Sequence, residues 1–186
     1  MSRPRARHPE PRGCPRRAPS RAALGFIGRF VLGWVVVLLV ATLVPAIERR
    51  AIAGTVSSVA GVLRAATFRP VVSDASILVG ARPIEITPDC TPLMPTAALW
   101  VAMLAFPATL PWRLAGALAG AAVLWIYNIV RIIAMIGVLN TRPAWFELLH
   151  VYMWQTLTLV VVIGVFLMWL RLEPRAHPAP SPSPGG

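Results

Sequence analysis

Apolar residues dominate four long stretches of the chain, and short polar segments separate them. The stretches cover residues 26–47, 91–106, 114–139 and 147–170. A helix needs about 20 apolar residues to cross the hydrocarbon core of a bilayer. The pattern therefore predicts an all-α polytopic membrane protein with about four transmembrane helices. The second stretch is short, so we expect it to begin with a partly immersed turn that contains proline.

A less apolar segment, residues 48–90, follows the first stretch. Its apolar residues Ile52, Val56, Val59 and Leu63 recur at helical spacing, which predicts an amphipathic helix lying at the membrane surface. Further on, β-branched runs flank Gly80, and residues 84–87 alternate between apolar and polar. This pattern predicts a β-hairpin. Helix and hairpin together are expected to form a small extracytoplasmic cap.

Both ends of the chain differ from the apolar body. Residues 1–25 and 173–186 are rich in proline and polar or charged residues and lack an apolar period, which is typical of disordered segments. We therefore predict a single membrane domain over residues 26–172 between two disordered tails. The composition agrees, because 56% of all residues are hydrophobic and only 13% are charged, against about 25% charged in an average soluble domain.

The net charge of +11 comes entirely from arginine, since the chain has no lysine. Such a charge favours nucleic-acid binding in a soluble protein, but most of these arginines flank the apolar stretches. With four spans and a cytoplasmic N-terminus, eleven arginines lie inside and six outside. The positive-inside rule then places both termini in the cytoplasm, and no nucleic-acid partner is expected. We predict a multi-pass protein of the cytoplasmic (inner) membrane.

Three chemically distinctive side chains fall near the outer face in this topology. They are Cys90 before the second stretch, Arg131 in the third, and His150 in the fourth. Alone, each has a plain structural explanation: a small buried thiol, an arginine reaching for the interface, and an interfacial histidine. Together they suit thiol-based acyl transfer, in which imidazole moves the thiol proton and arginine stabilises an oxyanion. Asn128 shares the helix face of Arg131.

The order Cys90, then "NIVRI" at residues 128–132, then His150, all in apolar surroundings, resembles the exosortase/archaeosortase family of membrane cysteine transpeptidases. The resemblance covers about residues 70–160. It implies that Cys90 is the nucleophile, Arg131 the stabiliser of the oxyanion or substrate, and His150 the acid/base, with the active site extracytoplasmic. The chain departs from the family pattern after the cysteine, where it has Thr91-Pro92-Leu93, and it is shorter than many members.

The resemblance also implies partners. The substrates would be C-terminal sorting signals of exported, membrane-tethered proteins, and the acceptor a glycan or lipid. No metal or organic cofactor is expected. Two alternatives stay open at the level of the sequence: a non-enzymatic membrane scaffold or chaperone subunit, and a membrane thiol protease that uses water as acceptor.

Overall fold

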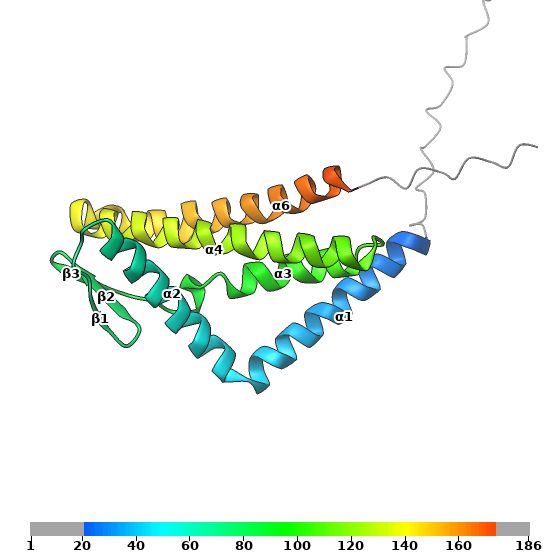
Figure 1. Ribbon diagram of the computed structural model, residues 1–186, viewed down its shortest axis with the longest axis horizontal. Helices are drawn as coiled ribbons and strands as arrows, with labels where there is room; N and C mark the ends of the chain where they lie inside the picture. The colour runs from blue at the N-terminus through cyan, green and yellow to red at the C-terminus, as the bar shows by residue number, and fades with distance from the viewer. Residues whose placement is uncertain (1–20, 174–186) are drawn as a thin grey trace, which may run out of the picture.

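The computed structural model describes residues 21–173, so the predicted tails lie outside the described residues up to residue 20 and from residue 174. Helices dominate (Figure 1). The longer ones are α1 (Arg21–Leu43), α2 (Pro45–Ala65), α3 (Leu93–Ala105), α4 (Leu110–Thr141) and α6 (Trp154–Leu172). After a break at Arg142, the chain is helical again through η2 (Pro143–Trp145), α5 (Phe146–Leu148) and η3 (Leu149–Met153) up to α6.

Three described helical segments are long and apolar enough to cross a membrane: Ala23–Leu43, Leu110–Thr141 and Pro143–Leu172. The second predicted span, in contrast, forms the 13-residue helix α3. At 1.5 Å per residue α3 is about 20 Å long, which is shorter than the hydrocarbon core. The fold therefore has three helices that are both long and apolar enough to span a membrane, so the prediction of about four transmembrane helices is confirmed for three of them.

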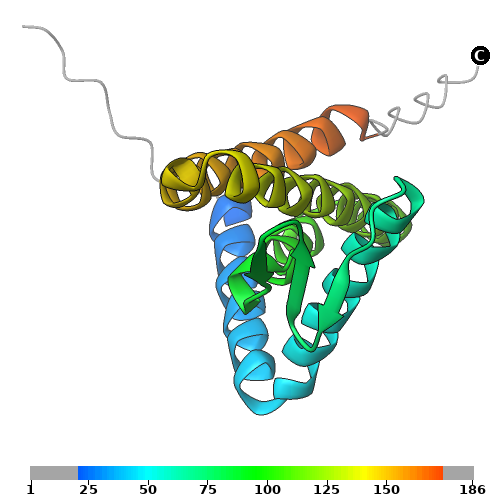
Figure 2. The same cartoon turned by 90° about the vertical axis from the view of Figure 1, so that its left-hand side faces the viewer.

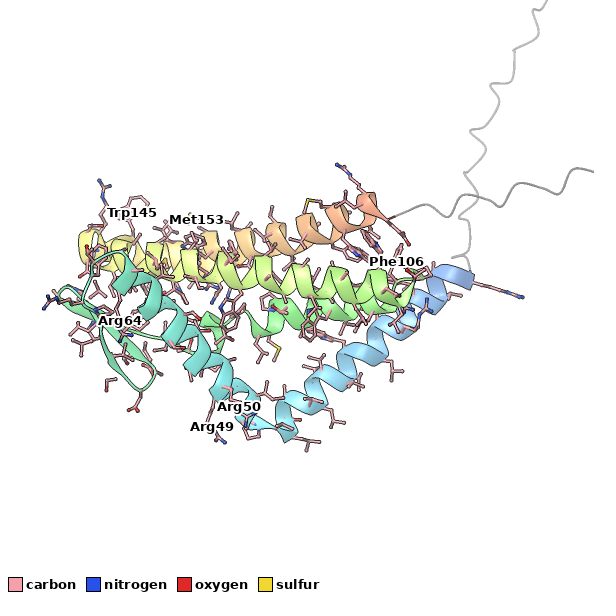
Figure 3. The ribbon with its side chains drawn as sticks, in the orientation of Figure 1. Arg49, Arg50, Arg64, Phe106, Trp145 and Met153 are labelled. Atoms are coloured by element: carbon pink, nitrogen blue, oxygen red, sulfur yellow. The ribbon has the colours of Figure 1, made fainter. Side chains whose placement is uncertain are left out.

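The segment after α1 folds as a helix and a small sheet. Proline has no N–H and is favoured in the first turn of a helix, and Pro45 starts α2 directly after the break at Val44. Helix α2 buries the side chains of Val56, Val59 and Leu63, three of the residues from the predicted apolar face. Arg49 and Arg50 lie at the elbow between α1 and α2 (Figure 3).

The predicted hairpin is not confirmed as a two-stranded unit. Strands β1 (Val71–Ser73), β2 (Ser76–Val79) and β3 (Arg82–Glu85) form one antiparallel sheet in that order. Gly80 adopts a φ of 83° in the turn before β3, a conformation that favours glycine. Asn140 of α4 holds this turn, because its side chain donates to the Val79 carbonyl at 2.8 Å and accepts from the Ala81 N–H at 3.1 Å.

The elements are distributed along one long axis. The start of α1, the connection from α3 to α4 and the end of α6 lie at one end, and the sheet and the connection from α4 to α6 lie at the other (Figure 1). Viewed along this axis, α1 and α2 form a V that encloses α3 and the sheet on one side of α4 (Figure 2). One apolar core, which includes Leu99 and Trp169, lies between α3, α4 and α6. The other joins α2, the sheet and the distal half of α4, and it contains Cys90.

Several predicted boundaries shift. Helix α1 begins at Arg21, inside the predicted tail. The segment between the second and third apolar stretches, residues 107–113, is largely helical, because α4 already starts at Leu110 with Pro111 in its first turn. Proline fits the first turn of a helix, so Pro111 belongs to α4, and the connection between α3 and α4 is shorter than predicted.

Candidate functional site

Cys90 closes a short 3-10 turn, η1 (Pro88–Cys90), that precedes α3. Its N–H donates to the Thr87 carbonyl at 2.9 Å, and the Thr87 hydroxyl donates to Sγ at 3.5 Å. The hydroxyl of the next residue, Thr91, donates to the Pro88 carbonyl at 2.7 Å. The cysteine is 7% exposed and unpaired. Local hydrogen bonds thus fix its backbone and leave the thiol at the edge of an apolar core.

Asn128 ties this turn to the middle of α4. Its side-chain amide donates to the Cys90 carbonyl at 2.8 Å, and the residue is only 3% exposed. A buried amide in an apolar helix is unfavourable unless it is hydrogen-bonded. The bond therefore explains why α4 tolerates an asparagine there, and it fixes Cys90 relative to α4.

Arg131 lies one helical turn after Asn128 and is 7% exposed. Within residues 21–173 its guanidinium has neither a hydrogen bond nor an ion pair. It lines a cavity of about 280 Å³ that also takes in the residues on both sides of Cys90. The polar residues that line this cavity are Glu48, Asp89, Thr91, Arg131, Gln155 and Thr158. A buried cation without a partner beside a cavity points to a ligand with negative or partly negative oxygen atoms.

His150 lies in η3, a π-helical turn between α5 and α6. Single π turns are rare and frequently occur at functional sites. The ring is half-buried and stacks on Phe146 with ring centres 5.5 Å apart. Arg131, Glu147 and Asp89 are near enough to act on its charge. The side chain of Tyr127 stabilises the following turn, because its hydroxyl lies 3.0 Å from the Thr158 hydroxyl and 3.3 Å from the Trp154 carbonyl.

The four predicted site residues are therefore not equally connected. Cys90 and Asn128 are hydrogen-bonded, and Arg131 lines the cavity beside them. His150 is related to this group only through its electrostatic neighbours. In the described part of the chain, no hydrogen bond joins its ring to the Cys90 thiol. Residues 21–173 also contain no cluster of three or more His, Cys, Asp or Glu side chains that could hold a metal.

Sequence reasoning missed the other polar walls of the cavity. Glu48 follows the first apolar stretch directly and precedes two arginines, so in the sequence it is indistinguishable from an ordinary loop charge. Gln155 and Thr158 carried a usable signal, because two polar residues three positions apart share one face of an otherwise apolar helix. Asp89 is adjacent to Cys90, but the sequence does not show on which side of the turn its carboxylate lies.

Comparison with known proteins adds no relative. No family model, no curated protein and no solved structure matches this chain.

Proposed function

We propose that this protein is a membrane-embedded cysteine peptidase or transpeptidase that processes C-terminal sorting signals of exported proteins. In this proposal the protein crosses the inner membrane several times with both termini in the cytoplasm, and its active site faces the extracytoplasmic side. Cys90 is the nucleophile, His150 the acid/base, Arg131 the group that stabilises the oxyanion, and Asn128 a positioning residue.

The observation that carries the proposal is the buried, unpartnered guanidinium of Arg131 in a cavity beside Cys90. An arginine costs about 2.5–3.5 kcal/mol at the centre of a membrane-spanning helix and less toward its ends, and ionisable residues within such helices usually have a function. Here Arg131 is 7% exposed, and within residues 21–173 it forms no ion pair with an acidic side chain. A carbonyl oxygen that becomes an oxyanion beside Cys90 would provide the missing partner.

The reaction follows from these positions. The Cys90 thiol gives its proton to His150, and the thiolate attacks the scissile carbonyl carbon. The carbonyl electron pair moves onto oxygen, where Arg131 stabilises it, and on collapse the peptide nitrogen leaves with the proton from His150. The products are a Cys90 thioester and the released C-terminal segment. An acceptor nucleophile then attacks the thioester and regenerates the thiol.

The proposed identity of the substrate and of the acceptor rests on the resemblance to the exosortase/archaeosortase family. The order Cys90, Asn128, Arg131 and His150 carries that resemblance. A substrate would carry a recognition motif, one transmembrane helix and a basic end. A glycan or lipid acceptor would make the enzyme a transpeptidase, whereas water would make it a thiol protease.

The test is the fate of exported proteins in host cells that carry either the wild-type chain or Cys90→Ala. Quantitative proteomics would measure the peptides from their C-terminal helices. We expect these helices to be lost from a defined set of proteins in wild-type cells and retained in Cys90→Ala cells at equal membrane level of both chains. Cys14→Ala is the matched control and should behave as wild type. Normal processing by Cys90→Ala would refute the proposal.

A second candidate is a non-enzymatic scaffold or chaperone subunit. The observation that favours it is the environment of the thiol, which belongs to an apolar core and is hydrogen-bonded only by Thr87 among the described residues. A scaffold needs Cys90 for packing alone, so Cys90→Ala would then leave processing unchanged.

A further inference from the structure

Glu48 and Asp89 have no part in the proposed reaction, although both line the cavity at Arg131. Both carboxylates are exposed, whereas Arg131 is buried. The cavity thus presents a cation without a partner on its inner wall and two anions nearer its rim. A ligand that matches this arrangement carries a negative group and a positive group within a short distance of each other.

The depth of the cavity indicates where such a ligand would come from. Arg131 lies about 32 Å from the start of α4 at Leu110, at 1.5 Å per residue. The hydrocarbon core is about 30 Å thick. If α4 starts at the inner edge of the core, Arg131 lies at the level where the outer lipid head groups begin.

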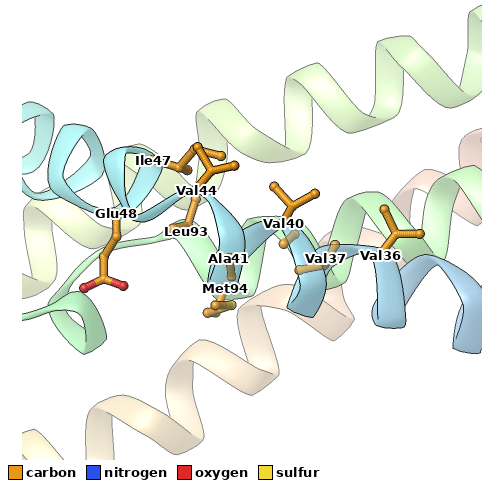
Figure 4. Close-up of a pocket in the computed structure, with 10 residues that line it drawn as sticks. Val36, Val37, Val40, Ala41, Val44, Ile47, Glu48, Leu93 and Met94 are labelled. Atoms are coloured by element: carbon orange, nitrogen blue, oxygen red, sulfur yellow. The ribbon is translucent and has the colours of Figure 1, made fainter.

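An apolar groove continues from the cavity along α1. It has a volume of about 240 Å³ and shares Glu48, Leu93 and Met94 with the cavity at Arg131. Figure 4 shows Glu48 at one end of the groove, followed by aliphatic side chains of α1 that include Val40, Val37 and Val36. Among the described residues that line the groove, Glu48 carries the one acidic group. The apolar lining of this groove suits one lipid acyl chain.

We infer that the cavity and the groove bind a zwitterionic phospholipid whose head group carries a primary amine. Its phosphate contacts Arg131, its ammonium group contacts Glu48 and Asp89, and one acyl chain follows α1. Charge complementarity selects this ligand over an anionic lipid, which would leave both carboxylates facing negative charge. A primary ammonium also donates hydrogen bonds to carboxylates, which a quaternary ammonium cannot do.

The inference does not depend on the proposed reaction, but the two meet at Arg131. A substrate carbonyl at the guanidinium would occupy the position of the phosphate, so lipid and substrate are expected to compete there.

The experiment is native mass spectrometry of the purified full chain with phosphatidylethanolamine, phosphatidylcholine or phosphatidylglycerol of identical acyl chains. We expect phosphatidylethanolamine to bind about tenfold more tightly than phosphatidylglycerol, as loss of a charge-assisted bond predicts. Glu48→Gln should remove most of this preference. Arg131→Gln should weaken binding of both lipids, and Glu85→Gln, an exposed carboxylate on β3, should change neither.

Equal binding of the three lipids would overturn the inference, and so would an unchanged preference in Glu48→Gln. Equal binding of phosphatidylethanolamine and phosphatidylcholine would refute the role of the primary amine. Because Glu48 is exposed, its replacement tests the site even if Arg131→Gln does not fold. The binding readout is also independent of peptide processing, so a failed lipid site and a failed enzyme give different results.

Discussion

At the scale of single residues, a substitution of Arg131 can distinguish an enzyme from a scaffold. Lysine keeps the charge but has no planar fork of N–H groups. If Arg131 stabilises an oxyanion, Arg131→Lys should lower the processing rate about 100- to 1,000-fold, the usual effect of losing one such donor. Pulse-chase analysis of a processed exported protein measures the rate. Arg113→Lys, outside the cavity, is the control, and full activity of Arg131→Lys would show that the fork is not needed.

Asn128 permits a second test at this scale, because Asn140 on the same helix offers a matched control. Each donates from its side chain to a backbone carbonyl at 2.8 Å, Asn128 to Cys90 and Asn140 to Val79. Loss of the buried bond from Asn128 should lower the free energy of unfolding by about 1–3 kcal/mol, because the Cys90 carbonyl stays unsatisfied. The bond from Asn140 is exposed, so its loss should cost less, since water can replace the donor. Only Asn128→Ala should also slow processing, by misplacing Cys90.

Thermal unfolding in detergent measures the stability of both variants, and pulse-chase analysis measures their activity. Equal losses of activity in Asn128→Ala and Asn140→Ala would assign Asn128 a purely structural role.

At the scale of elements, the π-helical turn Leu149–Met153 determines the direction of His150. A π turn contains one residue more than an α-helical path requires. Deleting the exposed Val151 should let the segment close as an α-helix. His150 would then turn by about 100° relative to α6, the rotation of one residue.

We expect the Val151 deletion to enter the membrane at normal level and to lose processing activity. Val151→Ala keeps the residue count and should retain activity. The comparison uses membrane immunoblots together with the processing assay. An active deletion variant would show that the position of His150 on the helix does not matter.

At the scale of the whole molecule, the arrangement of the ends predicts the topology. The sheet lies at one end of the long axis and the connection from α3 to α4 at the other (Figure 1). In a chain that carries Cys14→Ser and Cys90→Ser, we introduce Arg82→Cys or Thr109→Cys, both at exposed positions. A membrane-impermeant maleimide added to spheroplasts should label only Arg82→Cys. Labelling of Thr109→Cys alone would show that the protein has the opposite orientation in the membrane.

The sequence by itself determined the elements that depend on local pattern. Apolar runs longer than a bilayer is thick predict long apolar helices, and α1, α4 and the segment ending in α6 are such helices. The apolar spacing in α2 likewise predicted which side chains it buries, since helical periodicity is a property of neighbouring residues. Asn128, Arg131 and His150 stood out because polar groups are costly in apolar helices, and Cys90 stood out because the sequence has one other cysteine, Cys14, near its start.

Tertiary structure decided what depends on contacts between distant residues. The third strand of the sheet, the bond from Asn128 to the Cys90 carbonyl and the π turn under His150 have no local signal. Glu48 reaches the cavity only because Pro45 breaks the helix and α2 turns back toward α4. Such contacts depend on packing and chain direction over tens of residues, whereas hydropathy and spacing report only on the residues of one segment.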